Sequence, residues 1–303
     1  MKMKNAVLLL LTSFIWGTAF VAQSLGMDYM GPFVFNGLRN IIAGVALLPV
    51  IWLLPRILKE EKKKASEKSG KDLVLGGLLC GLCLFAGSSL QQVGIQYTTV
   101  GKAGFIVTFY IVLVPLFGIF LGKKMGWKIW MSVGIALAGL YFLCLTETLT
   151  IGFGEFLTFL SAVVFSFHIL VVDHFAPKVD GTKLACVQFF FCGLICVIPS
   201  VLFESFQLSM LKEGLIPLLY AAILSSGVGF TLQIVGQKDM NPAIASLILS
   251  LEATFSVLAG WVILGERLTA REKLGCLLMF GAILLVQLPE PKKVLRQEEQ
   301  YDS

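Results

Sequence analysis

Charged residues are scarce in this chain. Asp, Glu, Lys and Arg together make up 14% of its 303 residues, whereas hydrophobic residues make up 57%. A soluble domain has about a quarter charged residues, and polar groups cover much of its surface. The composition therefore excludes a water-soluble globule of this length and predicts a chain that presents apolar side chains to lipid.

Motifs for nucleotide-driven or hydrolytic chemistry are also missing. The sequence contains no GxxxxGK[ST], HExxH or GxSxG pattern, so direct ATP drive and the common hydrolase chemistries are not expected. Two histidines are too few for an imidazole metal site. The single CxxC, Cys80 and Cys83, lies in an apolar run without a second pair, which favours packing over redox chemistry. We expect no cofactor, no metal and no catalytic residue.

Long apolar runs dominate what is present. About 20 apolar residues suffice to cross a bilayer as a helix. Runs of this kind predict ten membrane helices, at 5–25, 32–54, 72–95, 101–121, 127–146, 153–174, 182–203, 214–236, 242–264 and 271–288. Only the charged segment from Pro55 to Lys71 and the tail after Pro289 have the composition of solvated, flexible chain.

Basic residues give the predicted orientation. With the N-terminus in the cytoplasm, 18 Lys and Arg residues fall on cytoplasmic segments and 5 on outer segments. Cytoplasmic loops carry such an excess in membrane proteins. We expect both termini in the cytoplasm of a bacterium and the chain in its cytoplasmic membrane. The net charge of +5 then needs no nucleic-acid partner, and membrane lipids are the expected surroundings. The sequence does not predict an oligomeric state.

The second half of the chain echoes the first. An offset of 142 residues aligns Gly87 with Gly229 and Gln91 with Gln233, and an offset of 149 aligns Gly44 with Gly193. Five spans per copy is an odd number, so the second copy would enter the membrane from the opposite side, as in many secondary transporters. The predicted fold is an all-α polytopic membrane protein with ten transmembrane helices, arranged as two inverted-topology five-helix repeats at 1–148 and 149–291. A flexible cytoplasmic tail at 292–303 follows.

Several motifs resemble those of EamA-type transporters of the drug/metabolite transporter superfamily. The stretch from Asp239 to Thr269 is similar to the closing half of an EamA domain, through Pro242, Ala245-Ser246, Leu251-Glu252, Gly260 and Leu264-Gly265-Glu266. The run from Gly94 to Gly122 is similar to its first-half counterpart, and Trp16-Gly17 resembles a pair common in the first span. The likeness covers nearly the whole chain as two EamA domains.

The resemblance implies a ten-helix fold around a central cavity, with peripheral fifth and tenth helices. It also implies transport of small metabolites, often amino acids outward, by alternating access. The chain departs from many relatives in two places, Ala253 where they have proline and Lys123 where they have glutamate. Neither departure challenges the family, and both warn against taking a substrate from one member.

Two ionisable side chains lie at membrane depth, Arg39 in the second span and Glu252 in the ninth. Such residues cost about 2.5–3.5 kcal/mol on insertion scales and persist where they face water or the bundle interior. We expect Arg39 to attract a substrate carboxylate and Glu252 to attract an ammonium group or a coupled proton. The alternative is a structural pair, in which the two bind each other or backbone carbonyls.

Other polar and aromatic side chains at depth complete the predicted cavity. Neutral amides are costly to leave unpaired in hydrocarbon, so they line a cavity or bond between helices. His168 could relay protons or be a hydrogen-bonded structural histidine, and Trp16 and Tyr110 could stack on a substrate or pack in the core. The predicted substrate-binding and cavity-lining residues are Trp16, Asn36, Arg39, Gln91, Tyr110, His168, Gln188, Gln233 and Glu252.

Together these features favour a secondary transporter that moves a small organic metabolite, with an amino acid as the leading candidate, out of the cytoplasm. The alternative from another class is an intramembrane enzyme acting on a lipid-soluble substrate. That enzyme would need a clustered catalytic set, whereas Arg39, His168 and Glu252 lie on separate spans. A channel would need a continuous polar face, which no span has.

Overall fold

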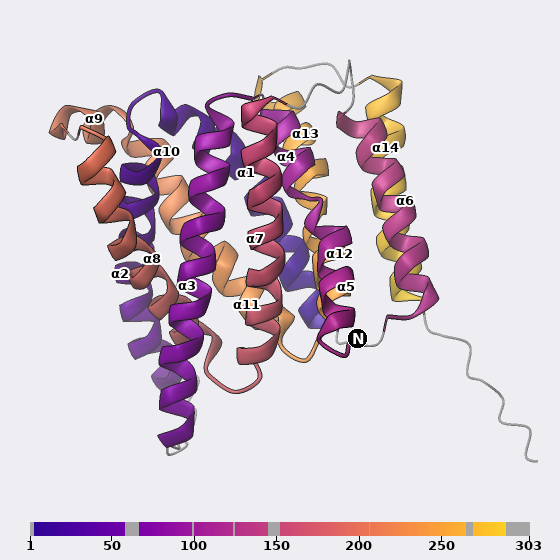
Figure 1. The fold of residues 1–303 in the computed structure, drawn as a ribbon, viewed down its shortest axis with the longest axis horizontal. Helices are drawn as coiled ribbons and strands as arrows, with labels where there is room; N and C mark the ends of the chain where they lie inside the picture. The colour runs from indigo at the N-terminus through magenta and orange to yellow at the C-terminus, as the bar shows by residue number, and fades with distance from the viewer. Residues whose placement is uncertain are drawn as a thin grey trace, which may run out of the picture.

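The computed structural model of the protein describes residues 3–57, 67–98, 100–123, 125–144, 152–205, 207–264 and 269–288. Every regular element within these ranges is a helix. The boundary predicted between residues 148 and 149 and the tail predicted at 292–303 lie outside the described residues. The axes of the helices lie side by side and roughly parallel in one bundle, and the N-terminal end of the chain lies at its lower edge in Figure 1.

Eight helical segments within the described residues are long and apolar enough to cross a membrane. Their helices are α1 (Met3–Met27), α2 (Pro32–Ile57), α3 (Glu67–Ile95), α4 and α5 (Val100–Val107, Tyr110–Phe120), α7 (Phe153–Phe175), α8 (Gly181–Phe203), the segment α10–η1–α11 (Leu215–Leu219, Tyr220–Phe230, Thr231–Gln237), and α12 and α13 (Pro242–Leu249, Leu251–Leu264), with the short α9 (Leu208–Glu213) after α8. Because α2 reaches Ile57 and α3 begins at Glu67, the solvated segment expected from Pro55 to Lys71 is too long at both ends.

Two further apolar helices, α6 (Trp127–Cys144) and α14 (Ala270–Gln287), lie together at one side of the bundle (Figure 1). Each has 18 residues, which gives a length of about 27 Å. That is slightly less than the ~30 Å hydrocarbon core of a bilayer. They pack closely because Gly139 has no side chain: a Cβ there would lie 2.9 Å from the carbonyl oxygen of Gly275.

Two of the spans are broken at positions 142 residues apart. The first break separates α4 from α5 at Thr108 and Phe109, and the second separates α12 from α13 at Ser250. The Thr108 hydroxyl donates to the carbonyl of Phe105 at 2.7 Å, and the Ser250 hydroxyl donates to that of Leu247 at 2.8 Å. A hydroxyl that bonds the preceding turn competes with the helix ladder and favours a bend.

The third irregular element is η1, a π-helix of 11 residues. Wide i→i+5 turns are rare and occur mostly at functional sites. Gly227 and Gly229 lie within η1, and a Cβ on Gly229 would come within 2.6 Å of the Trp16 indole nitrogen. The missing side chain therefore lets α1 approach this segment closely.

Helices α2 and α8 pack against each other through small residues and run in opposite directions. A Cβ on Gly37 would lie 3.2 Å from Cys196, one on Gly44 would lie 3.1 Å from the Phe190 ring, and one on Gly193 would lie 2.6 Å from Ile41. Close approach of this kind supplies the van der Waals packing that holds membrane helices together, because lipid is as apolar as their side chains.

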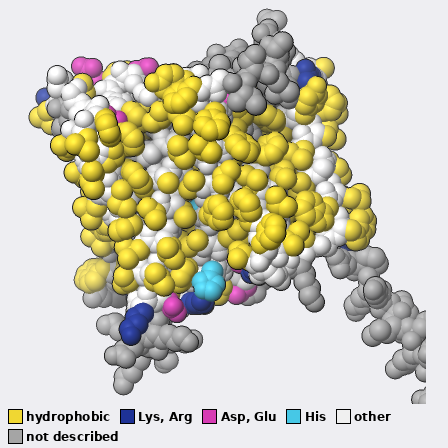
Figure 2. Space-filling model, in the orientation of Figure 1, with side chains coloured by type: hydrophobic (Ala, Val, Ile, Leu, Met, Phe, Trp, Pro, Cys, Tyr) yellow, Lys and Arg dark blue, Asp and Glu magenta, His cyan; other side chains and the backbone are white. Residues whose placement is uncertain are grey.

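The outer surface matches a protein embedded in lipid. In Figure 2 hydrophobic side chains cover the middle of the visible face, and charged side chains gather at its upper and lower edges. Many large apolar side chains are exposed, among them Leu194, Val201, Phe203, Ile216 and Val262. Water would not favour such a surface, whereas a bilayer does. The protein is an integral membrane protein.

Candidate functional site

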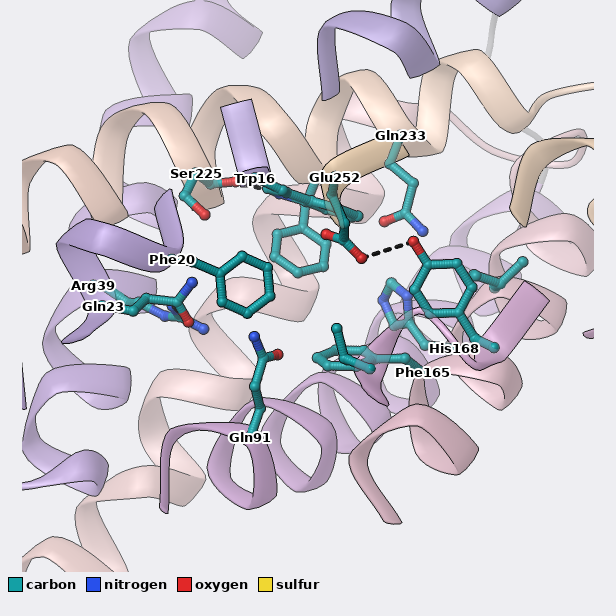
Figure 3. A pocket seen from close by; sticks show the side chains of 14 residues that line it. Trp16, Phe20, Gln23, Arg39, Gln91, Phe165, His168, Ser225, Gln233 and Glu252 are labelled. Atoms are coloured by element: carbon teal, nitrogen blue, oxygen red, sulfur yellow. Dashed lines mark hydrogen bonds between the residues drawn. The ribbon is translucent and has the colours of Figure 1, made fainter. Parts of the chain in front are cut away.

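A cavity of about 50 Å³ lies inside the bundle. Helices α1, α2, α3, α4, α5, α7, α11, α13 and η1 contribute its walls, so distant parts of the sequence meet there. Its volume exceeds the ~15 Å³ that one water needs by this measure, so it has room for a few water-sized groups. The residues lining it are Trp16, Phe20, Gln23, Arg39, Gln91, Val107, Tyr110, Phe165, His168, Ile169, Ser225, Phe230, Gln233 and Glu252 (Figure 3).

The α1 wall follows helical periodicity. Trp16, Phe20 and Gln23 are spaced four and three residues apart, which puts them on one face of the helix. The Trp16 indole nitrogen donates to the carbonyl of Ser225 at 3.1 Å, and its ring contacts that of Phe230 at 4.7 Å between centroids. Trp16 is therefore fixed against η1 and forms a rigid part of the wall.

An acidic end of the cavity is formed by Glu252 and Tyr110. The Tyr110 hydroxyl donates to Glu252 Oε1 at 2.7 Å, and both side chains are buried (Figure 3). Both residues come directly after a helix break, Tyr110 at the start of α5 and Glu252 near the start of α13. The break therefore places the carboxylate in the first turn of a helix, where the helix dipole favours negative charge.

A basic part of the cavity is formed by Arg39. Arg39 Nη1 donates to Gln23 Oε1 at 3.2 Å, and the guanidinium lies 5.9 Å from the centre of the Phe35 ring. The backbone carbonyl of Gln23 accepts from Gln92 Nε2 at 3.0 Å, which ties α1 to α3 at this level.

Arg39 and Glu252 do not form an ion pair with each other. Both are described residues, and the ion pair that the described residues do contain joins Lys123 to Asp173. Figure 3 shows Arg39 at the left of the lining residues and Glu252 near their centre, with the Phe20 ring between them. The alternative in which these two charges hold the helices together as a mutual pair is therefore wrong for this conformation.

His168 lies in the α7 wall with Phe165 and Ile169. Its Nε2 is 3.1 Å from Gln188 Oε1, and its ring meets that of Phe230 at 5.7 Å. His168 thus borders the cavity and makes the hydrogen bond of the structural alternative, and a proton relay stays a prediction. Which nitrogen carries the proton depends on the tautomer.

Seven of the nine residues predicted to line a cavity do so. They are Trp16, Arg39, Gln91, Tyr110, His168, Gln233 and Glu252. The other two, Asn36 and Gln188, are fully buried but do not border the cavity. Gln188 instead contacts His168 from α8, a helix that packs mainly against α2 and α3.

Sequence reasoning missed several lining residues, of which Gln23 and Ser225 are the polar ones. The spacing of seven from Trp16 could have indicated Gln23, since residues i and i+7 share a helix face. No sequence signal indicated Ser225, because its carbonyl becomes a partner for Trp16 only through the π-helical turn of η1.

Gly17, next to Trp16, has a packing reason for lacking a side chain. A Cβ at this position would lie 2.7 Å from the carbonyl oxygen of Glu252 and 2.6 Å from Cβ of Phe255. The Trp-Gly pair thus does two things at once: Trp16 lines the cavity, and Gly17 lets α1 approach the helix that carries Glu252.

Comparisons with known proteins agree with this architecture. The sequence model of the EamA-like transporter family matches twice, over residues 3–145 and 152–288. A transporter of Archaeoglobus fulgidus is 30% identical over 281 residues, which cover 92% of this chain and 84% of the relative. The transporter YoaV of Bacillus subtilis is 24% identical and covers 89% of this chain and 92% of its own length.

An inner membrane transporter of Escherichia coli, YedA, is 22% identical over 90% of this chain and 87% of its own length. A solved crystal structure superimposes with a TM-score of 0.76 over 95% of this chain and 97% of that one, at 17% identity. That likeness concerns the fold alone. Two matches of one family model, covering nearly all of the sequence, show that the chain belongs to the EamA-like transporter family.

Proposed function

We propose that this protein is a secondary carrier that exports a small organic metabolite, with an amino acid as the leading candidate, across the cytoplasmic membrane of a bacterium. The observation that carries the proposal is the cavity, which is lined by a buried cation, Arg39, and a buried acid, Glu252, that stand apart and are unpaired with each other. Each charge is costly at this depth. A zwitterion that presents its carboxylate to Arg39 and its ammonium to Glu252 would compensate both.

The proposed mechanism is alternating access by two inverted five-helix repeats, residues 1–148 and 149–291, with ten spans and both termini in the cytoplasm. Equivalent contacts in the two halves support it. In one contact Gly87 approaches the Phe165 ring, and in the other Gly229 approaches Trp16. The two contacts are equivalent, because the offset of 142 aligns Gly87 with Gly229 and the offset of 149 aligns Trp16 with Phe165. The opposite directions of α2 and α8, which are equivalent to each other, also favour inversion.

The broken spans support binding at this level. Discontinuous helices form the substrate sites of many secondary transporters, because their exposed ends supply partners for polar solutes. Here the two breaks flank the Tyr110–Glu252 hydrogen bond, so the same segment that holds the acid is also the one able to bend. Protonation of Glu252 would offer a route for coupling solute movement to a proton.

Counterflow tests the proposal directly. Purified protein is placed in liposomes loaded with one unlabelled amino acid at a time, and uptake of the radiolabelled form is followed. Transient accumulation above equilibrium is expected of a carrier, whereas a channel gives none. Recovery of chemically unchanged label separates the carrier from an intramembrane enzyme. No counterflow with any amino acid would overturn the proposed substrate class.

Two substitutions test the roles of the charges. Arg39→Gln and Glu252→Gln are each expected to reduce counterflow at least about tenfold, because hydrogen bonds to charged groups are worth about 1.5–3 kcal/mol. Arg271→Gln and Glu213→Gln are matched controls, since both lie outside the cavity at helix ends. Thermal melting checks that all four variants are folded. Normal counterflow in both cavity variants would end the assignment.

Topology is tested by cysteine labelling in a cysteine-free background. Lys71→Cys and Lys212→Cys are exposed positions on α3 and α9. A membrane-impermeant maleimide added to intact cells is expected to label the second and to spare the first until the cells are opened. Labelling of both from the same side would contradict the inverted arrangement.

A further inference from the structure

Of the fourteen buried side-chain atoms without a hydrogen-bond partner among the described residues, six belong to Arg39 and four other residues of α2 and α3. Asn36, Arg39 and Asn40 lie on α2 at helical spacing, and Ser88 and Gln92 lie four residues apart on α3. None is more than 3% exposed. In these five residues, the atoms that lack a nitrogen or oxygen partner among the described residues are Asn36 Oδ1 and Nδ2, Arg39 Nε, Asn40 Oδ1, Ser88 Oγ and Gln92 Oε1. We refer to these five residues as the polar face.

Helical register brings the two halves of the polar face to one level. On α2 the apolar residues Ala43 and Leu47 continue the same face beyond Asn40, and on α3 Cys80 and Leu84 precede Ser88. These four apolar residues belong to one packed cluster. Because α2 and α3 follow each other in the chain and run in opposite directions, both faces change from apolar to polar at the depth of Arg39.

Side-chain contacts also join the polar face to Arg39. The side-chain oxygen of Gln23 accepts a hydrogen bond from Arg39, and its backbone carbonyl accepts one from Gln92. The thiols of Cys192 and Cys196 on α8 lie beside Arg39, and Cys192 is also next to Ser88. All these neighbours are neutral, so no carboxylate of the described residues compensates the guanidinium.

An anion is the group that this face lacks. A buried polar atom without a partner is unfavourable, and a buried charge without a partner is more so. Arg39 Nε, Asn36 Nδ2 and Ser88 Oγ are donors, so they can bind the oxygens of a carboxylate next to the positive charge. Asn40 Oδ1 and Gln92 Oε1 are acceptors, and they suit an N–H or O–H group carried beside that carboxylate.

Four of the five polar-face residues have apolar counterparts in the second half, and the fifth, Arg39, has the neutral Gln188. At the offsets of 142 and 149 residues, Asn36, Asn40, Ser88 and Gln92 correspond to Ala185, Phe189, Phe230 and Ile234. These four counterparts are buried members of one apolar cluster. Repeated architecture alone would make both sides alike, so the difference points to a ligand with one polar end.

We propose that the polar face binds the carboxylate of the transported solute, in a single orientation, with the rest of the solute directed toward the apolar side. The proposal rests on the proposed function, because it takes the solute to be the carried one. It adds Asn40, Ser88 and Gln92 to the binding site and keeps Asn36, which the sequence predicted, although none of the four borders the cavity in this conformation.

Acetate is the probe for the experiment, since it carries the carboxylate alone. Full-length purified protein is melted in sodium acetate and in sodium chloride at equal ionic strength. A ligand that binds only the folded state raises the melting temperature, and the rise grows with the logarithm of the ligand concentration relative to its dissociation constant. We expect a higher melting temperature in acetate than in chloride, and loss of this difference in Arg39→Gln. Equal melting in the two salts overturns the carboxylate site.

Substitutions locate the binding. Ser88→Ala is expected to weaken acetate binding about tenfold, because it removes one hydrogen bond to a charged group. Ser132→Ala on α6 is the matched control: its hydroxyl is also fully buried and without a protein partner, but it lies on a helix that does not line the cavity. Equal weakening in the two variants, or none in Ser88→Ala, overturns the proposal.

A gain-of-charge variant keeps the test valid if other variants do not fold. Asn36→Asp places a carboxylate one helical turn from Arg39. It is expected to raise the melting temperature without acetate and to abolish the acetate effect, since the side chain occupies the anion's place. An unchanged acetate effect contradicts the site.

Amino acid counterflow without acetate stabilisation overturns this inference alone, whereas acetate binding without counterflow overturns only the proposed function.

Discussion

Tyr110 donates a 2.7 Å hydrogen bond to Glu252, and the two residues are 142 positions apart. The same offset aligns Gly87 with Gly229 and Gln91 with Gln233, so Tyr110 and Glu252 occupy one position in two copies of a repeat. The repeats have diverged there into a donor and an acceptor. A contact between equivalent positions can form only near an axis that relates the two copies, which is where a shared cavity would lie.

Removing the Tyr110 hydroxyl tests the strength of this contact. Tyr110→Phe leaves Glu252 buried without its donor, so we expect a loss of about 1–3 kcal/mol of stability and a lower melting temperature. Tyr97→Phe is the control, because Tyr97 is 62% exposed and keeps its ring contact with Phe153. Thermal melting in detergent compares the two. Equal melting temperatures would show that the hydroxyl contributes nothing to the folded state.

Gly229 is expected to be intolerant of a side chain. In Gly229→Ala the new Cβ would lie 2.6 Å from the Trp16 indole nitrogen, so the bond from Trp16 to the Ser225 carbonyl must break or shift. Fluorescence of Trp16, measured with the other four tryptophans replaced by phenylalanine, should shift to longer wavelength.

The matched control is Gly134→Ala on α6, where a Cβ meets nothing within 4 Å. Alanine favours a helix over glycine by about 1 kcal/mol, so this variant should be as stable as the original or slightly more so. Identical spectra and stabilities for the two alanine variants would be inconsistent with the close approach of α1 to η1.

Glu204 stabilises the start of α2 from the end of α8. Its Oε1 accepts from the backbone N–H of Phe33 at 2.8 Å and its Oε2 from that of Val34 at 2.7 Å. Glu204→Gln removes the negative charge at a helix N-terminus and one acceptor, so we expect a loss of about 1 kcal/mol. Melting against Glu213→Gln, an exposed position on α9, measures the effect. A similar small change in both variants would refute the capping role.

Lys123 and Asp173 form an ion pair of 2.6 Å between the end of α5 and the end of α7. Lys123 is 42% exposed, so a double-mutant cycle with Lys123→Ala and Asp173→Ala should give a coupling energy below about 1 kcal/mol that falls further at high salt. The reversed pair, Lys123→Asp with Asp173→Lys, should restore the original stability. A coupling that does not respond to salt would contradict a solvent-exposed pair.

Composition and hydrophobic run length determined, by themselves, that this chain lies in a membrane and that its spans are helices. Burying these side chains in lipid leaves the backbone no alternative but to satisfy its own hydrogen bonds. Motifs and the internal offset indicated the family, and the cost of charge in hydrocarbon indicated that Arg39 and Glu252 face the interior. These inferences depend on local properties of single spans.

Tertiary structure decided which interior residues meet. It set Arg39 and Glu252 apart in the wall of one cavity, gave Glu252 its partner in Tyr110, and placed Asn36 and Gln188 away from the open space. It also introduced the π-helical turn that offers the Ser225 carbonyl to Trp16. Sequence could not supply these facts, because periodicity gives the faces of a helix but not the rotation and depth at which neighbouring helices pack. Rotation and depth are fixed by the fit of small residues, such as Gly17 and Gly229, against side chains distant in the sequence.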